Sequence, residues 1–445
     1  MSTAAEADPA AGTHPAAGTD PAAGTHPAAG THPAAGTDPA AGAHPAAGTD
    51  PAAGTHPAAG TDPAAGAHPA TGTDPAVPFA AGSEGHASYR IPAVVRTASG
   101  ALLAFCEGRL ESARDWGRIH IVMKRSTDGG RTWGPLSVVA ANGPDLAGNP
   151  APVVLDTGRV LLVHVRSAAS AAEHLIVRGE VSEADGRRVW VQHSDDEGHT
   201  WSEPREITER VKEPGWRWYA TTPGHGIQLT GGRVVVPGNH TLPPAAGDLG
   251  DEPRYNNAHC LLSDDRGESW YLGHVDRDTS GHVNGNETTA AELPDGRVYF
   301  NTRTDSLRPG NRADAHSADG GRTLLAPFHP QPGLAGPVCQ GSLLHLGDPD
   351  VLLFSGPAHP TGRARMTLRA STDGGATWHD AHTVDDRPAA YSDLVRVDAD
   401  TVGLLYETGD AGAYERIVFR RIPVSRLTRR GAVGEGPVPG RKVGP

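Results

Sequence analysis

Cysteine is scarce in this chain. Three cysteines occur in 445 residues, at wide and irregular spacings: Cys106, Cys260 and Cys339. An odd number at such spacings predicts neither a disulfide framework nor a zinc ribbon, so we expect three buried or partly buried free thiols. No pair of histidines at metal-binding spacing and no cage of carboxylates accompanies them. We therefore expect no metal ion and no other cofactor.

Long hydrophobic runs are also missing. No stretch approaches the roughly 18 apolar residues that a membrane-spanning helix requires, so we expect no membrane span. Residues 1–6 contain neither the basic region nor the apolar core of a secretory signal. On this basis we expect a cytoplasmic protein, with secretion by another route left open. The net charge of -13 argues against nucleic acid or an anionic membrane surface as the main partner.

The first part of the chain lacks large apolar side chains. From Pro9 to about Pro75 it repeats a six-residue unit, Pro-Ala-Ala-Gly-Thr/Ala-His/Asp. Proline and glycine in every unit interrupt a helix, and no bulky side chain offsets the entropy of ordering. Glycine at every sixth position excludes collagen. We expect residues 1–77 to form a disordered tail or spacer without a catalytic role. Its histidines could bind metal, but solvated, flexible histidines are the favoured interpretation.

The composition changes at about residue 78. From there to residue 428, short apolar runs alternate with Gly/Asp turns, which is typical of an all-β fold. A motif, Ser-x-Asp-x-Gly-x-Thr/Ser-Trp, occurs at 126–133, 194–201, 263–270 and 371–378, with a decayed copy at 317–324. We expect its Ser and Asp to bond the amides of a tight turn, and its Trp to plug the layer below. This structural role is favoured over catalysis by Asp128 or Asp196.

A second repeat consists of hairpins in which a Gly/Asp turn leads into an apolar strand. Its six copies span 97–105, 155–163, 229–237, 293–301, 346–354 and 397–406. Their spacing of roughly 50–75 residues corresponds to one four-stranded propeller blade with its loops. We therefore predict a six-bladed β-propeller over residues 78–428, as one domain. Residues 429–445 are expected to be a flexible C-terminal tail.

Several charged residues stand beside these hairpins, where the inner strands of a propeller would meet at its channel. Tyr89-Arg90-Ile91-Pro92 opens the first strand, Asn286-Glu287 precedes Arg303, and Ala390-Tyr391-Ser392-Asp393 comes late in the chain. Together with the Ser-x-Asp-x-Gly motifs, known as Asp boxes, this ordered set resembles the bacterial and animal exo-α-sialidase family. The resemblance covers residues 78–428 and none of the tail. It implies a retaining exo-sialidase that removes terminal sialic acid from glycans.

The resemblance implies a role for three arginines. Arg90, Arg303 and Arg363 match the arginine triad of the family. Sialic acid carries its carboxylate on the anomeric carbon. Guanidinium groups form forked hydrogen bonds with a carboxylate and would hold the reacting carbon in place.

The resemblance also implies the reacting groups. Tyr391 matches the family's nucleophile and Glu287 its base partner. A carboxylate nucleophile would be repelled by the substrate's own carboxylate, whereas a neutral phenol would not. Asp115 matches the general acid/base, in a loop that could close over substrate. Glu111 is the competing assignment for this role.

Three further residues are candidates for substrate binding. Arg109 matches a pocket arginine, although a buried structural pair with Glu107 is the alternative. Asn149 and Tyr219 are additional pocket candidates. Some family members carry an aspartate near the position of Asn149, so its contact with the sugar is left open.

Two other functions remain possible at this stage. One is a trans-sialidase, which transfers the sugar to an acceptor or to itself. The other is a non-catalytic Asp-box propeller that binds glycans, which would tolerate loss of Tyr391, Glu287 or an arginine; all are present. The expected partners are sialylated glycans on glycoproteins, gangliosides or oligosaccharides, with no nucleic acid. We expect the protein to be a monomer.

Overall fold

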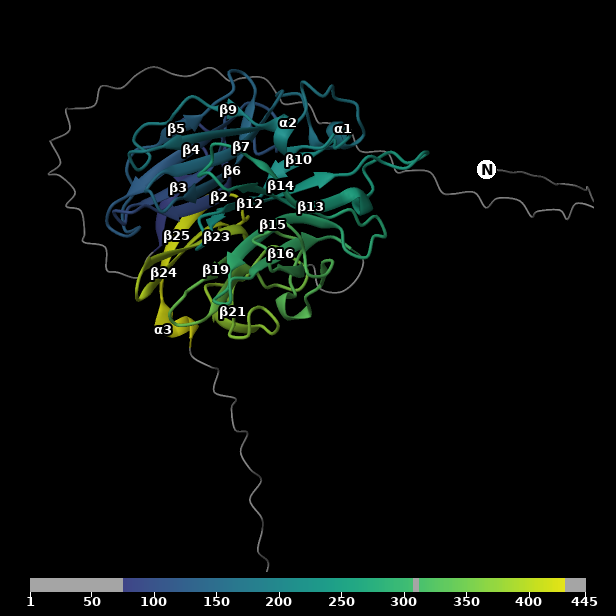
Figure 1. Cartoon of the computed structure of the whole chain (residues 1–445). Helices are drawn as coiled ribbons and strands as arrows, with labels where there is room; N and C mark the ends of the chain where they lie inside the picture. The colour runs from purple at the N-terminus through teal and green to yellow at the C-terminus, as the bar shows by residue number, and fades with distance from the viewer. Residues whose placement is uncertain (1–74, 307–311, 429–445) are drawn as a thin grey trace, which may run out of the picture. The chain divides into compact units, whose positions relative to one another are not determined.

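The computed structural model describes residues 75–306 and 312–428 (Figure 1). The two predicted tails therefore lie almost entirely outside the described residues. The first strand, β1 (Ala76–Ala80), begins two residues before the predicted start of the domain. No helix in the described part of the chain is both long enough and apolar enough to cross a membrane.

Within the described residues the strands form five hydrogen-bonded sheets in a propeller-like arrangement. The first sheet contains β2 (Ser88–Arg96), β3 (Leu102–Arg109), β4 (Ile119–Ser126), β5 (Ser137–Ala140), β6 (Leu146–Val154), β7 (Val160–Ser167), β8 (Arg188–Ser194) and β9 (Arg205–Glu206). The second contains β10 (Tyr219–Thr221), β11 (Ile227–Gln228), β12 (Val234–Thr241), β13 (Asn256–Ser263) and β14 (Tyr271–Val275).

The remaining three sheets have four strands each. The third contains β15 (Gly285–Glu292), β16 (Val298–Thr304), β17 (Arg312–Ser317) and β18 (His329–Pro330). The fourth contains β19 (Ser342–His345), β20 (Leu352–Pro357), β21 (Met366–Ser371) and β22 (His379–Thr383). The fifth contains β23 (Ala389–Asp398), β24 (Thr401–Thr408), β25 (Arg416–Pro423) and β1. The helices are α1 (Glu173–Val177), α2 (Thr208–Val211), α3 (Val424–Leu427), η1 (Pro253–Tyr255) and η2 (Pro332–Leu334).

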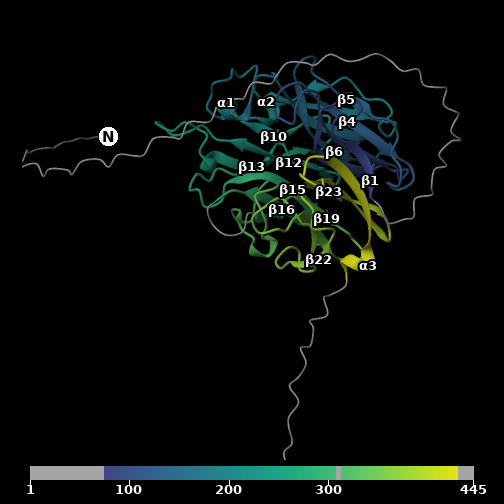
Figure 2. The same ribbon diagram turned by 180° about the vertical axis from the view of Figure 1, so that it is seen from behind.

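The sheets follow one another in chain order, and the fifth returns to the first (Figures 1 and 2). β1 pairs with β25, so an N-terminal strand completes a sheet built from the C-terminal strands. The first sheet has eight strands because a single parallel bridge, Ile119 to Leu146, joins β4 to β6. The prediction of an all-β propeller is therefore confirmed in its general form.

All six predicted hairpins are present as antiparallel strand pairs. In the second hairpin, Gly158 lies in the turn with φ +87°, a conformation that side chains other than glycine rarely adopt. The local turn residues and the apolar strand that follows them explain why sequence alone located these pairs.

The Asp boxes form compact turns stabilised by their own side chains. In the second box, Asp196 accepts bonds from the Thr200 amide at 2.8 Å and from its hydroxyl at 2.5 Å. The decayed box repeats this pattern, because Asp319 bonds Thr323 in the same way at 2.9 and 2.7 Å. These carboxylates are occupied by their turns, and none lines the cavity described below. The structural interpretation of the boxes is thus the one that the geometry supports.

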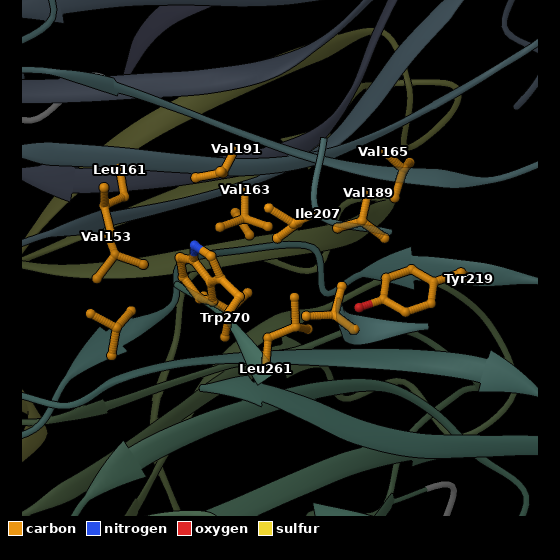
Figure 3. Packing of buried hydrophobic residues seen from close by; sticks show 14 of the residues in the cluster. Val153, Leu161, Val163, Val165, Val189, Val191, Ile207, Tyr219, Leu261 and Trp270 are labelled. Atoms are coloured by element: carbon orange, nitrogen blue, oxygen red, sulfur yellow. The ribbon is translucent and has the colours of Figure 1, made fainter. Parts of the chain in front are cut away.

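The hydrophobic core lies between neighbouring sheets. Figure 3 shows one part of it, where Trp270 from the third Asp box packs near Leu261 and below Val163. Leu261 and Val163 are completely buried. Burying a side chain of this size stabilises the fold by about 1.5–3 kcal/mol. Layers of this kind hold the inner strands, and therefore the site, in fixed positions.

Candidate active site

A cavity of about 450 Å³ lies where the inner strands of several sheets meet. Its lining comprises Arg90, Ile91, Glu107, Arg109, Ala113, Asp115, Asn149, Glu173, Arg187, Trp218, Ala220, Asn239, Asn286, Glu287, Arg303, Arg363, Tyr391 and Tyr414. Eight of the nine site residues that the sequence suggested are in this set; Tyr219 is the exception. The cavity therefore brings together residues separated by about 300 positions in the chain.

Backbone irregularities aim many of these side chains. The inner strands β2, β6, β15 and β23 each lose register beside a cavity residue. The shifts lie at Arg90/Ala93, Gly148/Ala151, Gly285/Thr288 and Ala389/Ser392. Such bulges bend a strand and redirect its side chains, and they are common next to active sites. Ile91 and Asn149 lie inside two of them with φ +62° and +53°, which is rare for residues other than glycine.

Tyr391 and Glu287 form the centre of the site. The Tyr391 hydroxyl donates a hydrogen bond to Glu287 Oε1. Arg303 Nη1 donates to the other carboxylate oxygen, Oε2, at 2.7 Å and to the Tyr391 oxygen at 3.1 Å. Burial and the Glu287 charge raise the pKa of Tyr391 well above its usual value, so the phenol is neutral at rest. Its nearest proton acceptor is Glu287.

The other two predicted triad members flank the same ring. The Cζ atoms of Arg90 and Arg363 lie 5.4 and 5.5 Å from the ring centroid of Tyr391. Arg363 donates to the Tyr414 hydroxyl at 2.9 Å and to the Val338 carbonyl at 3.0 Å. No carboxylate among the described residues pairs with Arg363, so its charge is available to an anionic ligand.

Glu407 on β24 holds Arg90 and the nucleophile strand together. It is completely buried, and its Oε1 accepts bonds from Arg90 Nε at 2.7 Å and from the Ile91 amide at 2.9 Å. Its Oε2 accepts from the Tyr391 amide at 3.1 Å. The sequence analysis missed this residue. The available signal was a charged residue within an otherwise apolar strand.

Arg109 links a buried carboxylate to the loop after β3. Its Nη2 lies 2.7 Å from Glu107 Oε2 and 2.6 Å from Asp115 Oδ1, and its Nη1 donates to the Ala113 carbonyl at 2.6 Å. Both alternatives for Arg109 therefore hold, since it pairs with Glu107 and also lines the cavity. Asp115 lines the cavity and Glu111 does not.

The charge of Asp115 is set by its arginine neighbours. Burial acts to raise the pKa of this carboxyl, but the charges of Arg109 and Arg90 outweigh it. The pKa of Asp115 is therefore lowered, and the group is an anion at neutral pH.

The prediction that Tyr219 lines the pocket is wrong. Its side chain is completely buried in the core (Figure 3), with its ring 4.7 Å from that of His259. The neighbours Trp218 and Ala220 line the cavity instead. Successive residues of a strand point to opposite faces, so β10 turns Tyr219 away from the cavity.

Asn149 does line the cavity. Its short hydrogen bonds are made by its backbone. Its amide donates to Glu107 Oε1 at 2.9 Å, and its side-chain oxygen is 3.5 Å from Arg187 Nη1. Arg187 in turn lies over the ring of Trp218 at 4.4 Å. Arg187, Trp218 and Glu173 were missed because no local motif marks them.

The described residues contain no group of three or more His, Cys, Asp or Glu side chains arranged to hold a metal ion. The positive charge at this site comes from arginines. Chemically, the cavity offers guanidinium groups for a carboxylate, a phenol bonded to a base, and a second carboxyl at its edge.

Comparison with known proteins identifies the family. The model of the BNR repeat-like domain matches residues 92–405. An exo-alpha-sialidase of Aspergillus fumigatus is 30% identical over 77% of this chain and 85% of that protein. A sialidase of Micromonospora viridifaciens is 34% identical over 75% of this chain, which spans about half of that protein (52%).

A solved structure agrees with this similarity. The Hadza microbial sialidase Hz136 superposes with a TM-score of 0.68 at 30% identity, over 78% of this chain and 68% of that chain. The chain therefore belongs to the sialidase family of glycoside hydrolases with BNR (Asp-box) repeats.

Proposed function

We propose that the chain is a retaining exo-α-sialidase that hydrolyses terminal α-linked sialic acid with Tyr391 as nucleophile. The observation that carries this proposal is the shared contact of Tyr391, Glu287 and Arg303. The phenol is bonded to a carboxylate that can take its proton, and one guanidinium contacts both groups. Sialylated glycans are accordingly the proposed substrates.

Substrate binding would begin at the arginines. Arg303 lies on β16, Arg90 on β2 and Arg363 between β20 and β21. Arg90 and Arg363 flank the Tyr391 ring. A carboxylate that accepts bonds from these guanidinium groups would bring the anomeric carbon over the phenol oxygen. Charge-assisted bonds of this kind are about twice as strong as neutral ones. They would fix the reacting carbon before any bond changes.

In the first step, the Tyr391 oxygen attacks the anomeric carbon while its proton passes to Glu287. Asp115, protonated on substrate binding, gives its proton to the departing glycosidic oxygen. The bond between the anomeric carbon and that oxygen breaks, and a covalent bond forms between the anomeric carbon and the Tyr391 oxygen, which makes an aryl glycoside of the enzyme. Binding of the substrate carboxylate to Arg90 would partly neutralise the positive charge that helps to keep Asp115 ionised. The pKa of Asp115 would then rise, which favours its protonated form.

In the second step, Asp115 takes a proton from water, and the hydroxide oxygen that results attacks the anomeric carbon. The bond to Tyr391 breaks, and Glu287 returns the proton to the phenolate. Two displacements at one carbon give net retention of configuration.

The architecture extends the same proposal. We infer six blades, in which β2–β5 and β6–β9 are separate four-stranded units joined by the Ile119–Leu146 bridge. In support, each unit repeats the hairpin order of the other sheets. Residues 1–77 and 429–445 are proposed as flanking tails, apart from the start of β1.

The test is hydrolysis of a fluorogenic sialoside by the full chain. Tyr391→Phe is expected to lower kcat/KM at least about a hundredfold, because the nucleophile is lost. Tyr219→Phe is the matched control, since its buried hydroxyl has no hydrogen-bond partner among the described residues and Tyr219 lies outside the cavity. The rate of this variant should stay within about twofold of wild type. NMR of the first-formed sugar should show the α-anomer.

Other results would redirect the proposal. Sialic acid appearing on an added acceptor, or as an internal anhydro sugar, would favour the trans-sialidase alternative. A folded wild type that releases nothing from any sialoside would favour the non-catalytic glycan-binding propeller.

A further inference from the structure

Two arginines face each other directly beside the cavity. The antiparallel register of β16 and β17 pairs Arg303 with Arg312. Arg303 lines the cavity, whereas Arg312 lies one strand further out and is only 3% exposed. Like charges at directly opposed positions of a sheet destabilise it. This pairing therefore needs a physical reason.

The contacts of Arg312 are all with neutral groups. Its Nε donates to Asn301 Oδ1 at 2.7 Å and its Nη2 to the Asn301 carbonyl at 3.2 Å. Its Nη1 donates to the Cys339 carbonyl at 2.9 Å, and its Cζ lies 5.1 Å from the centre of the Phe354 ring. Among the described residues no carboxylate pairs with Arg312, and residues 307–311 contain no acidic side chain.

Arg312 is nevertheless charged. Burial lowers the pKa of Arg312 to about 10, which leaves the guanidinium protonated at neutral pH. The buried carboxylate nearest along its own strand is Asp314. It is connected only indirectly, because Asp314 accepts from Tyr299, and the Tyr299 oxygen accepts from Asn301. A buried charge without a direct counterion is costly, and an apolar residue of similar size would often be at least as stable.

The nearby negative charge is already in use. Glu287 is the carboxylate whose charge acts most strongly on Arg312. Its two oxygens are engaged by Tyr391 and Arg303. Only Arg303 is paired with Glu287, so Arg312 adds a second positive charge beside the cavity that no carboxylate among the described residues contacts. An incoming carboxylate would supply the missing negative charge.

We propose that Arg312 is a positioning residue that strengthens carboxylate binding in the cavity through its charge, without touching the ligand. This inference rests on the proposed function, because it assigns the anion to the carboxylate of a sialoside. A buried charge is weakly screened by solvent, so its attraction reaches across one strand.

The test separates the charge of Arg312 from its hydrogen bonds. Arg312→Gln removes the charge, while Arg312→Lys retains it and loses most of the bonds. Asn301→Asp keeps Arg312 in place and puts a compensating carboxylate on its Nε partner. Arg369→Gln is the matched control, because Arg369 is also buried on a third strand but pairs with Asp380 at 3.0 Å, outside the cavity.

Calorimetry at low salt would measure the Kd of the full-length variants for DANA, an unsaturated analogue of sialic acid that carries the carboxylate. We expect Arg312→Gln and Asn301→Asp each to weaken binding about tenfold, or about 1.4 kcal/mol. Arg312→Lys should stay within about threefold of wild type, and Arg369→Gln within about twofold. Raising the salt concentration should only slightly reduce the difference in Kd between Arg312→Gln and wild type.

Two results would overturn the proposal. If Arg312→Lys binds DANA as weakly as Arg312→Gln, the bonds to Asn301 and Cys339 matter and the charge does not. If Asn301→Asp binds like wild type while thermal unfolding shows that it is folded, the charge does not reach the site. Failure of the proposed function is distinguishable, because it would appear as absent hydrolysis by the wild type, whereas calorimetry measures binding without turnover.

Discussion

At the scale of single residues, the proposed mechanism requires Asp115 to change its protonation state when substrate binds. The charges of Arg109 and Arg90 lower the pKa of Asp115, although burial acts in the opposite direction. A bound carboxylate would share Arg90 and lessen this effect. Because the proton donor is the protonated form, activity on substrates that need an acid should fall as the pH rises through the pKa of Asp115 in the complex.

Replacing Asp115 by Asn should therefore affect substrates unequally. For a sialoside whose leaving group is a sugar, we expect kcat/KM to fall about 10²- to 10⁴-fold, because a poor leaving group depends on the acid. An aryl sialoside with an acidic phenol should lose much less. The measurement is kcat/KM for both substrates across pH 4–8. Glu111→Gln, in the same loop but outside the cavity, is the control. Equal losses on both substrates would contradict the assignment.

Sequence located the residues of this site whose neighbours form a recognisable motif. Tyr391, Glu287 and Arg90 were all found this way. Glu407 and Arg187 were missed because their partners are distant in the chain: Glu407 bonds Arg90, 317 positions away. The wrong assignment of Tyr219 is a matter of strand phase, since its two neighbours line the cavity. Because side chains alternate between the two faces of a strand, an error of one residue in the assignment moves a side chain from the cavity to the core.

At the scale of elements, the Asp boxes stabilise turns, and their carboxylates do not line the cavity. In the first box, Asp128 accepts bonds from the Arg131 and Thr132 amides at 3.0 Å each and from the Thr132 hydroxyl at 2.7 Å. Although burial opposes the effect, these bonds lower the pKa of Asp128 to about 2. A carboxyl whose pKa is lower in the folded state stabilises the fold above its usual pKa and loses this effect as the pH falls.

Asp128→Ala should accordingly lower the free energy of unfolding by about 1–3 kcal/mol at pH 7. The difference from wild type should shrink as the pH falls from 4 toward 2, where the wild-type carboxyl takes up its proton. Urea unfolding followed by tryptophan fluorescence would measure it, and kcat should not change. Asp386→Ala, whose side chain is 87% exposed, is the control. A constant difference down to pH 2 would mean that the charge of Asp128 is irrelevant.

Hairpins and boxes were predictable because each depends on a few adjacent residues. The bulges in the inner strands were not. Three of them fall at Arg90, Glu287 and Tyr391, where the apolar alternation that identifies a strand is interrupted. The same irregularity that hides these positions from pattern analysis directs their side chains into the cavity.

At the scale of the whole molecule, the number of sheets depends on a single contact. Six hairpins predicted six blades, whereas hydrogen bonding among the described residues gives five sheets, one of which has eight strands. The Ile119–Leu146 bridge causes the difference. This bridge joins the first residues of two strands, and no sequence motif marks such a contact. The number of blades counted from hairpins therefore need not equal the number of sheets counted from hydrogen bonds.

The pairing of β1 with β25 yields a final prediction about the role of the N-terminal segment. Phe79 of β1 is completely buried, lies opposite Ile417, and contacts the Tyr89 ring at a centroid distance of 5.3 Å. Removing residues 1–74 should leave the unfolding midpoint and kcat unchanged. Removing residues 1–80 should destabilise the fold strongly, since losing one buried phenylalanine side chain alone costs about 3–5 kcal/mol.

Thermal unfolding of the two shortened chains beside the full chain would measure this difference, and Phe79→Ala in the full chain would show how much of it that side chain explains. Loss of β1 also leaves β25 as an open edge, which favours aggregation. We therefore expect the chain that begins at residue 81 to aggregate on heating, at a temperature below the midpoint of the chain that begins at residue 75. Equal midpoints would show that β23–β25 form a stable sheet without the N-terminal strand, and that closure of the propeller rests on the contacts between sheets alone.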